Sequence, residues 1–208
     1  MIQGQLDVPL DDVGQAQADA VAAVLGDPPP AVLLSSDLSR AAGTAEAIGR
    51  TGGVDVLLDA RLRELDLGAW QGLTSDEARE RFPEQWSDWR AGRDVPRGGG
   101  ETYAAAGARA ASCIRQGLSR LPEGGTLVAV THGGTARAAL GVLLALHPGS
   151  WGRLAPLGNT CWSTLVEAPW GWRLERHNAG LGPLLGPADG AHDLGSRPAL
   201  SPDDEPVR

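Results

Sequence analysis

The sequence predicts an α/β protein, a three-layer α/β/α sandwich built on a mostly parallel sheet. The wholly apolar run 31–34 is typical of a strand covered on both faces, and the run 126–131, apolar between two threonines, predicts another buried strand. These runs alternate with segments whose apolar residues recur at helical spacing, which indicates a parallel sheet flanked by helices. With 208 residues, 42% of them hydrophobic and 21% charged, the chain is long enough to bury one core.

Each element follows from a local pattern. Apolar side chains recur every three or four positions over 12–25, which predicts an amphipathic helix that the prolines at 28–30 terminate. The turn at 35–37 supplies capping residues for a second helix. Further along, apolar and polar residues alternate in two neighbouring stretches, which predicts a hairpin. In chain order we expect helices over 12–25, 38–50, 75–81, 101–121 and 133–146, strands over 31–34, 54–58 and 126–131, and hairpin strands over 161–167 and 172–177.

Composition divides the chain into two parts. Residues 1–179 carry all of these predicted elements, so we expect them to form one domain. Residues 180–208 are rich in Gly, Pro and Asp and poor in β-branched side chains, and such a segment cannot bury enough apolar surface to fold alone. We therefore predict a flexible acidic tail over 180–208.

Charge and hydropathy exclude several classes of protein. The net charge of −8 argues against nucleic-acid binding, which needs a basic face, and against attachment to anionic lipid. No stretch reaches the ~20 apolar residues of a membrane span, and the first ten residues do not form a signal peptide.

The two cysteines, Cys113 and Cys161, lie far apart and lack metal-type spacing to histidine. We predict a cytoplasmic protein with two reduced thiols.

Two residues break local rules at places where ligands bind. Arg40 falls in the first turn of a predicted helix, where a cation opposes the helix dipole. It is either a solvated surface side chain or part of an anion clamp. His132 ends a buried strand and precedes Gly133 and Gly134, which let a backbone approach a ligand closely. Open α/β sheets bind ligands at the carboxyl ends of strands, so His132 is either structural or a site residue.

The stretch 61–72 mixes charged residues with leucines and ends on Gly, Trp and Gly. Either its charges pair with one another, or one carboxylate, Glu64 or Asp66, is a proton donor with a raised pKa. The spacing does not decide between these alternatives. Further on, Trp86 and Trp89 lie three residues apart and would share one face of a helix.

Five stretches, in their order along the chain, resemble the histidine phosphatase superfamily, in its phosphoglycerate-mutase-like branch. They are QGQLDVPL, SSDLSRAAGTA, LRELDLGAWQGLT, GGGET and VAVTHGG. The resemblance runs from Gln3 to about Asn178. Within the branch, QGQLD, AWQGLT, GNTCW and WRLERHN are most similar to actinobacterial phosphatases of the glucosyl-3-phosphoglycerate phosphatase kind.

The resemblance assigns roles to five residues. Arg40 matches the arginine that grips the transferred phosphoryl group, Glu64 the proton donor and acceptor, and His132 the second histidine on the phosphoryl oxygens. Gln3 and Gly4 match a pair at the mouth of the substrate pocket. It implies hydrolysis of a small phosphorylated metabolite in two steps, through a phosphohistidine, with no metal and no cofactor. Whether the protein forms a homodimer is not decided by the sequence.

The element that defines this family is missing from the chain. The nucleophile of the family lies in an Arg-His-Gly motif that ends its first, central strand, about a dozen residues before the position of Gln3. The histidines here stand elsewhere, at 132, 147, 177 and 192, and we do not expect His177 to replace the nucleophile. Either the true start lies upstream of Met1, which we favour, or a natural variant has lost its catalytic strand.

Two other functions stay open beside the phosphatase. The same site in a phosphoglycerate mutase would transfer the phosphoryl group, although mutases carry a longer insert between the positions of Glu64 and His132. A chain without its nucleophile could also be a catalytically dead phosphate-binding or regulatory domain. For the phosphatase and the mutase alike, we expect Arg40, Glu64 and His132 to meet at one edge of the sheet, within roughly 10 Å of a common point.

Overall fold

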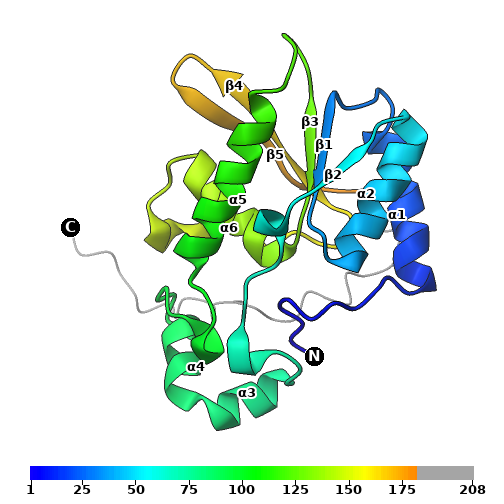
Figure 1. Cartoon of the computed structure of the whole chain (residues 1–208). Helices are drawn as coiled ribbons and strands as arrows, with labels where there is room; N and C mark the ends of the chain where they lie inside the picture. Colours follow the sequence, from blue (N-terminus) through cyan, green and yellow to red (C-terminus); the bar gives the residue numbers. More distant parts are fainter. Residues whose placement is uncertain (182–208) are drawn as a thin grey trace.

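The computed structural model describes residues 1–181, and its central element is a three-stranded parallel sheet with the strand order β2-β1-β3 (Figure 1). In the register of the two strands that carry the predicted site, Val32 lies opposite Leu127 and Ser35 opposite Val130. The strands of this sheet are β1 (Val32–Ser35), β2 (Val56–Leu58) and β3 (Leu127–Val130).

Helices cover both faces of this sheet, as a three-layer sandwich requires (Figure 1). Leu33 packs with α1 and α2 on one face, and its neighbour Leu34 packs with α5 and α6 on the other, because successive strand residues point to opposite faces. Gly107 lets α5 approach α6 closely, since a Cβ there would lie 2.8 Å from the Ala138 carbonyl oxygen. The helices are α1 (Asp12–Leu25), α2 (Ser39–Gly52), α5 (Tyr103–Leu118) and α6 (Gly133–Leu143).

The two strands beneath the site differ in how completely they are covered. All four residues of β1 are buried, whereas all four residues of β3 are only half-buried. In the described part of the chain β1 has a strand on each side, and β3 has a strand on one side only. The hairpin of β4 (Trp162–Ala168) and β5 (Gly171–Ala179) forms a separate antiparallel sheet.

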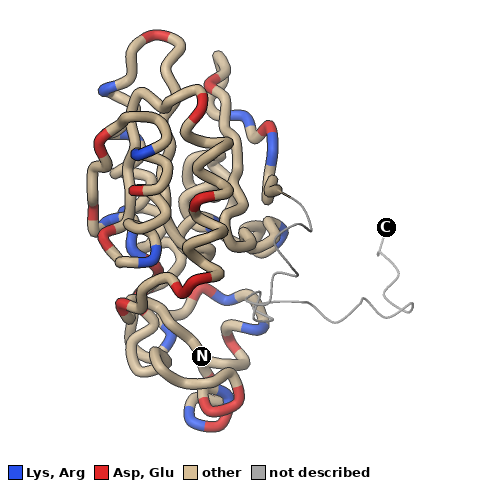
Figure 2. The backbone as a smooth tube through the Cα atoms, turned by 90° about the vertical axis from the view of Figure 1, so that its right-hand side faces the viewer, with Lys and Arg blue, Asp and Glu red and all other residues tan. Residues whose placement is uncertain are grey.

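A small helical cap lies beyond the carboxyl ends of the parallel strands (Figure 1). Its core is a cluster of aromatic rings, in which Trp70 contacts Phe82, Trp86 and Trp89 at centroid distances of 5.5 to 6.3 Å. Figures 1 and 2 both place the N-terminal end beside this cap, where Ile2 packs against it. The cap consists of η2 (Gly68–Trp70), α3 (Ser75–Arg81), α4 (Pro83–Arg90) and η3 (Arg97–Gly99).

Most predicted elements are confirmed, with differences at the ends of several elements and one helix that was not predicted. Helix α5 begins at Tyr103 instead of residue 101, because the Thr102 side chain caps it by accepting from the Ala105 amide. Helix α6 ends at Leu143 instead of residue 146. Helix α4, which carries Trp86 and Trp89, was not among the predicted elements. The predicted tail lies outside the described residues from residue 182 on.

Candidate active site

His132 lies where the carboxyl ends of β1 and β3 meet. Its Nε2 is 2.9 Å from the hydroxyl of Ser36, which is fully buried directly after β1. His132 is also the N-cap residue of α6. The pKa of His132 is lowered to about 4, chiefly by burial and to a smaller extent by Arg40, while Glu64 opposes the shift. The imidazole is therefore neutral at pH 7.

The carboxylate of Glu64 lies at the N-terminus of α6. It accepts hydrogen bonds from the Gly134 amide at 3.1 Å, from the Thr135 amide at 2.9 Å and from the Thr135 hydroxyl at 3.1 Å. The Leu65 amide donates to the same carboxylate at 2.9 Å. A helix N-terminus favours an anion because its N–H groups have no partner within the helix.

These contacts make Glu64 an acid with a lowered pKa. Burial opposes the shift, and the interaction with His132 and the backbone amides outweigh burial. The predicted raised pKa for a proton donor is therefore wrong for Glu64 in this structure. The physical reason is that its carboxylate sits on the N–H groups of α6 and not in an apolar pocket. At pH 7 Glu64 is ionised.

The geometry separates Glu64 from Asp66, which the sequence left as alternatives. The Asp66 carboxylate accepts from the amide of Gly68 at 2.9 Å, two residues along, as a turn residue does. Asp66 therefore shapes the loop, and Glu64 carries the carboxylate that faces His132.

Arg40 enters the same site from the first turn of α2. It is half-buried, and its guanidinium donates at 2.8 Å to the carbonyls of both Leu6 and Gly4. Its remaining N–H groups have no hydrogen-bond acceptor among residues 1–181. Arg40 interacts electrostatically with Glu64 and with His132. The structure thus brings these three side chains together, and the interpretation of Arg40 as a freely solvated surface residue is wrong.

The segment before α1 lies across this group of side chains. Gln3 is exposed, whereas Gly4 is buried in a left-handed conformation with a φ of 52°. A Cβ at Gly4 would lie 2.4 Å from the Gln71 side-chain oxygen, so a side chain there would displace Gln71, which accepts from the Gln5 amide. The Gln5 side chain donates to the Glu64 carbonyl at 3.0 Å. Residues 3–6 therefore form one wall of the site.

One of the two interpretations of the charged loop around Glu64 was that its charges pair with one another. In the structure, its arginines pair instead with carboxylates outside residues 61–72. Arg63 forms a bidentate ion pair with Asp37, at 2.7 and 2.6 Å, which ties the loop to the end of β1. Arg61 pairs with Asp59 directly after β2. These ion pairs fix the loop against the carboxyl ends of two strands.

Four further residues shape the site and were not predicted from the sequence. Ser36 contacts His132, Thr135 contacts Glu64, and Arg109 and Glu101 bind the loop that carries Glu64. Ser36 was a usable signal, because it directly follows β1 and polar side chains at the carboxyl ends of parallel strands face the ligand edge. Arg109 gave no signal, since one arginine on a long helix is usually exposed.

His177 lies on β5, and both of its ring nitrogens have partners. Nδ1 is 2.9 Å from the Ser163 hydroxyl, and Nε2 is 2.9 Å from the Ala155 carbonyl oxygen. These contacts tie the hairpin to the preceding loop, which is a structural role.

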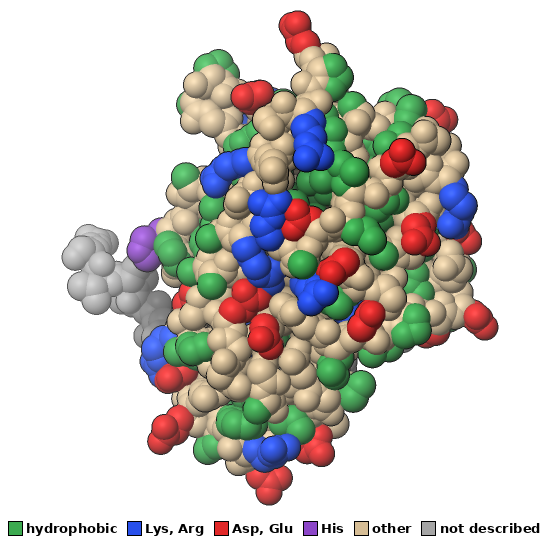
Figure 3. Space-filling view, viewed as in Figure 1, with side chains coloured by type: hydrophobic (Ala, Val, Ile, Leu, Met, Phe, Trp, Pro, Cys, Tyr) green, Lys and Arg blue, Asp and Glu red, His purple; other side chains and the backbone are tan. Residues whose placement is uncertain are grey.

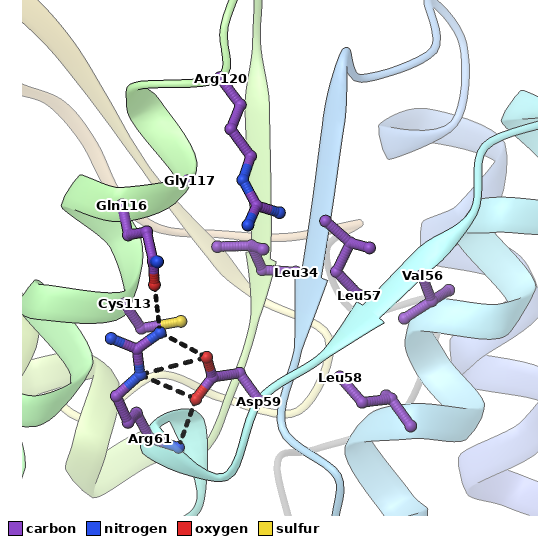
Figure 4. Close-up of a pocket in the computed structure, with 10 residues that line it drawn as sticks. All are labelled: Leu34, Val56, Leu57, Leu58, Asp59, Arg61, Cys113, Gln116, Gly117 and Arg120. Carbon is purple, nitrogen blue, oxygen red and sulfur yellow. Dashed lines mark hydrogen bonds and ion pairs between the residues drawn. The ribbon is translucent and has the colours of Figure 1, made fainter.

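A groove of about 420 Å³ lies elsewhere, between β2 and α5 (Figure 4). Leu34 and Leu57 line it together with Cys113, and Asp59 and Arg61 form an ion pair at one end. None of the three side chains that meet at the strand ends lines this groove. It is therefore separate from the candidate active site.

Further features of residues 1–181 concern metal ligands, membrane-spanning helices and surface charge. Residues 1–181 contain no group of three or more His, Cys, Asp or Glu placed to hold a metal ion. Within the same range no helix is long and apolar enough to cross a membrane. On the face seen in Figure 3, acidic and basic side chains lie close together.

Comparison with known proteins gives consistent matches. A sequence-family profile, described as the histidine phosphatase superfamily (branch 1), matches residues 1–180. The chain is 36% identical over 194 residues to glucosyl-3-phosphoglycerate phosphatase of Mycobacterium tuberculosis, covering 86% of both proteins. It is 35% identical over 184 residues to a probable phosphoglycerate mutase of Yersinia enterocolitica, covering 84% of this chain and 83% of that protein.

A solved structure shares the fold over most of the chain. The mycobacterial glucosyl-3-phosphoglycerate phosphatase in complex with inorganic phosphate superposes with a TM-score of 0.81 at 37% sequence identity. The match covers 86% of this chain and 91% of that one.

Proposed function

The chain belongs to the histidine phosphatase superfamily, and from this premise we propose that it is a phosphomonoesterase acting on a small phosphorylated metabolite of the phosphoglycerate or sugar-phosphate type. The observation that carries the proposal is the meeting of Arg40, Glu64 and His132 at the carboxyl ends of β1 and β3. A cation, a neutral imidazole and a carboxylate in one site suit phosphoryl transfer, which needs charge stabilisation and a proton donor.

Each of the three side chains has a task in this proposal. Arg40 binds phosphoryl oxygens with the N–H groups that the carbonyls of Gly4 and Leu6 leave free. The neutral imidazole of His132 donates a hydrogen bond to the same phosphoryl group. Glu64 protonates the leaving oxygen and then activates water, the order that a two-step hydrolysis requires.

The lowered pKa of Glu64 fits this task once substrate is present. In the empty site the backbone amides of Leu65, Gly134 and Thr135 donate to the carboxylate and favour its ionised form. A phosphate ester carries negative charge, and a like charge nearby raises the pKa of a carboxyl group. Substrate binding would therefore draw a proton onto Glu64 and prepare it as the acid.

The family's nucleophile lies in an Arg-His-Gly motif, and residues 1–181 do not contain this motif. We propose that a further parallel strand pairs with the open edge of β3 and delivers an Arg-His-Gly segment beside His132. Support comes from β3, which is half-buried along its whole length and has one strand partner among the described residues. An apolar strand with an open edge is a place where another strand adds.

The test is a grafted chain, in which a short apolar strand ending in Arg-His-Gly precedes Met1, with its histidine about a dozen residues before Gln3. The grafted chain should hydrolyse p-nitrophenyl phosphate, and residues 1–208 alone should not. Within the grafted chain, Arg40→Ala should lower kcat/KM by about 10²- to 10³-fold. The matched control is the graft with alanine in place of its histidine.

Two results would overturn the proposal. Activity that survives in the His-to-Ala graft would show that another group is the nucleophile. An inactive graft that still binds phosphate would favour the catalytically dead binding domain. Translation of the genomic frame upstream of Met1 checks the same point independently, because a stop codon within that interval would exclude an upstream start.

Phosphoglycerate mutase is the second candidate, because one relative carries that name at 35% identity. The two activities differ in the acceptor of the phosphoryl group, which is water in a phosphatase and a second hydroxyl in a mutase. Incubation of the grafted enzyme with 3-phosphoglycerate, followed by ³¹P NMR, separates them. Inorganic phosphate as the product supports the phosphatase, and 2-phosphoglycerate as the product supports the mutase.

A further inference from the structure

Arg109 reaches from α5 into the loop that carries Glu64. Its guanidinium donates to three backbone carbonyls, those of Arg61 at 2.6 Å, Arg63 at 2.8 Å and Glu64 at 3.0 Å. Its side chain is only 21% exposed. A planar guanidinium presents its donors in a fixed fork, so three carbonyls bound to it are held at fixed relative positions.

Glu101 completes this arrangement from the residues just before α5. Its carboxylate pairs with Arg109 and is 19% exposed. The same carboxylate accepts from the Asp66 amide at 2.9 Å, and the Glu101 amide donates to the Asp66 carbonyl at 2.9 Å. Arg109 and Glu101 thus bind the loop on both sides of Glu64.

The loop needs such an external clamp, because little regular structure holds it. Between β2 and the cap, residues 59–67 contain one short 3-10 turn, η1 (Ala60–Leu62). The direction of the Glu64 side chain therefore depends on where the loop backbone is fixed. From α6, the Thr135 hydroxyl shares its proton between the Arg63 carbonyl at 2.9 Å and the Glu64 carboxylate at 3.1 Å. The ion pairs of Arg61 and Arg63 fix the loop before Glu64, whereas Arg109 and Glu101 bind its backbone on both sides of Glu64.

We propose that Arg109, locked by Glu101, is a positioning residue that holds the Glu64 carboxylate on the N-terminus of α6. The inference rests on the proposed role of Glu64 as the acid and base, but its test does not depend on activity. Arg109 acts through the backbone and does not touch the substrate. Its geometry has to be separated from its charge, which also lowers the pKa of His132.

The experiment compares Arg109→Lys, Arg109→Met and Glu101→Gln in the full 208-residue chain by NMR. Arg115→Met serves as the matched control, because Arg115 is exposed on the same helix. One readout is the pH titration of the Glu64 side-chain carboxyl carbon. The others are hydrogen exchange at the Gly134 and Thr135 amides and the titration of His132.

Arg109→Lys keeps the positive charge but cannot span three carbonyls and a carboxylate. In this variant the pKa of Glu64 should rise toward its ordinary value and exchange at the two amides should speed up about tenfold. The pKa of His132 should fall, because the Glu64 carboxylate that raises it has moved away. Arg109→Met should move all three readouts, Glu101→Gln should act as Arg109→Lys does, and Arg115→Met should move none.

The proposal would be overturned if Arg109→Lys and Glu101→Gln left both the Glu64 titration and the amide exchange unchanged. Arg109 would then influence the site only through its positive charge. If Arg109→Met does not fold, these two milder variants decide. Failure of the proposed function looks different, because it would leave a grafted chain without phosphatase activity while all of these readouts behave as expected.

Discussion

Strands β1 and β3 have nearly the same kind of sequence and very different surroundings. Both are four-residue, largely apolar runs that lie between the same two helical layers. Every residue of β1 is buried, and every residue of β3 is half-buried. A strand's apolar pattern therefore specifies that both of its faces are covered, but its neighbours within the sheet decide whether it is fully buried.

The same contrast appears at the two strand ends, where the site lies. Ser36, which follows β1, is fully buried, whereas His132, which follows β3, is half-buried. Ser36 on the β1 side is thus enclosed, whereas Arg40, Glu64 and His132 are all half-buried. The support for placing the proposed nucleophile beside β3 is therefore the strand edge of β3 that has no partner among the described residues.

The largest expected effect is on stability and tests the contrast between the strands directly. Leu33→Ala in β1 should lower the free energy of unfolding by about 3–5 kcal/mol, because Leu33 is fully buried between two layers. Leu127→Ala in β3 removes the same atoms from a half-buried site and should cost about 1–2 kcal/mol. Urea denaturation measures both, and equal costs would contradict the difference in burial.

Glu64→Gln tests the contact between the loop and the helix that follows β3. At pH 7 the variant should be less stable by about 1.5–3 kcal/mol, the typical net contribution of hydrogen bonds to a charged group. The folded-state pKa of Glu64 is lowered, so the wild-type advantage is present above the ordinary value of 4.5 and is lost as the pH falls through the folded pKa.

Denaturation of Glu64→Gln and the wild type at a series of pH values makes this measurement. Glu123→Gln, at an exposed position, is the control and should differ little from the wild type at every pH. An advantage of wild type over Glu64→Gln that persists unchanged well below pH 4 would mean that the carboxylate is not bound as an anion.

His132→Asn tests the state of the imidazole at the end of β3. The unfolded chain takes up a proton on His132 near its ordinary pKa of 6.5, whereas the folded chain does so only near 4. Wild-type stability should therefore fall as the pH decreases from 6.5 to 4, and the variant should lose that part of the slope. Thermal melts of both proteins across this range, with His147→Asn as an exposed control, should show the difference; equal slopes would refute it.

Ser36→Ala has the smallest expected effect and tests the contact between the two strand ends. It removes a buried hydroxyl bonded to His132 Nε2 and to the Leu38 amide, which should cost about 1 kcal/mol. The ¹⁵N shifts of the His132 ring should change at the same time, because its hydrogen-bond partner is gone. Unchanged ring shifts would mean that Ser36 does not orient the histidine.

Much of this arrangement could be predicted from the sequence. The apolar runs and helical spacing identified the layers, and the polar residues after two strands placed Arg40 and His132 at one edge of the sheet. The contacts of Arg109 with three carbonyls could not be predicted, because they depend on how α5 packs on a loop far away in sequence. The lowered pKa of Glu64 was missed for the same reason, since it depends on the N-terminus of α6.

Binding of inorganic phosphate to the full chain tests most directly the central claim that Arg40, Glu64 and His132 share one phosphate. Titration followed by NMR should give saturable shifts at His132 and at the Gly134 and Thr135 amides. Arg40→Ala should weaken this binding at least about tenfold, while the exposed Arg79→Ala leaves it unchanged. Equal binding by the wild type and Arg40→Ala, or shifts that leave His132 unaffected, would contradict the account.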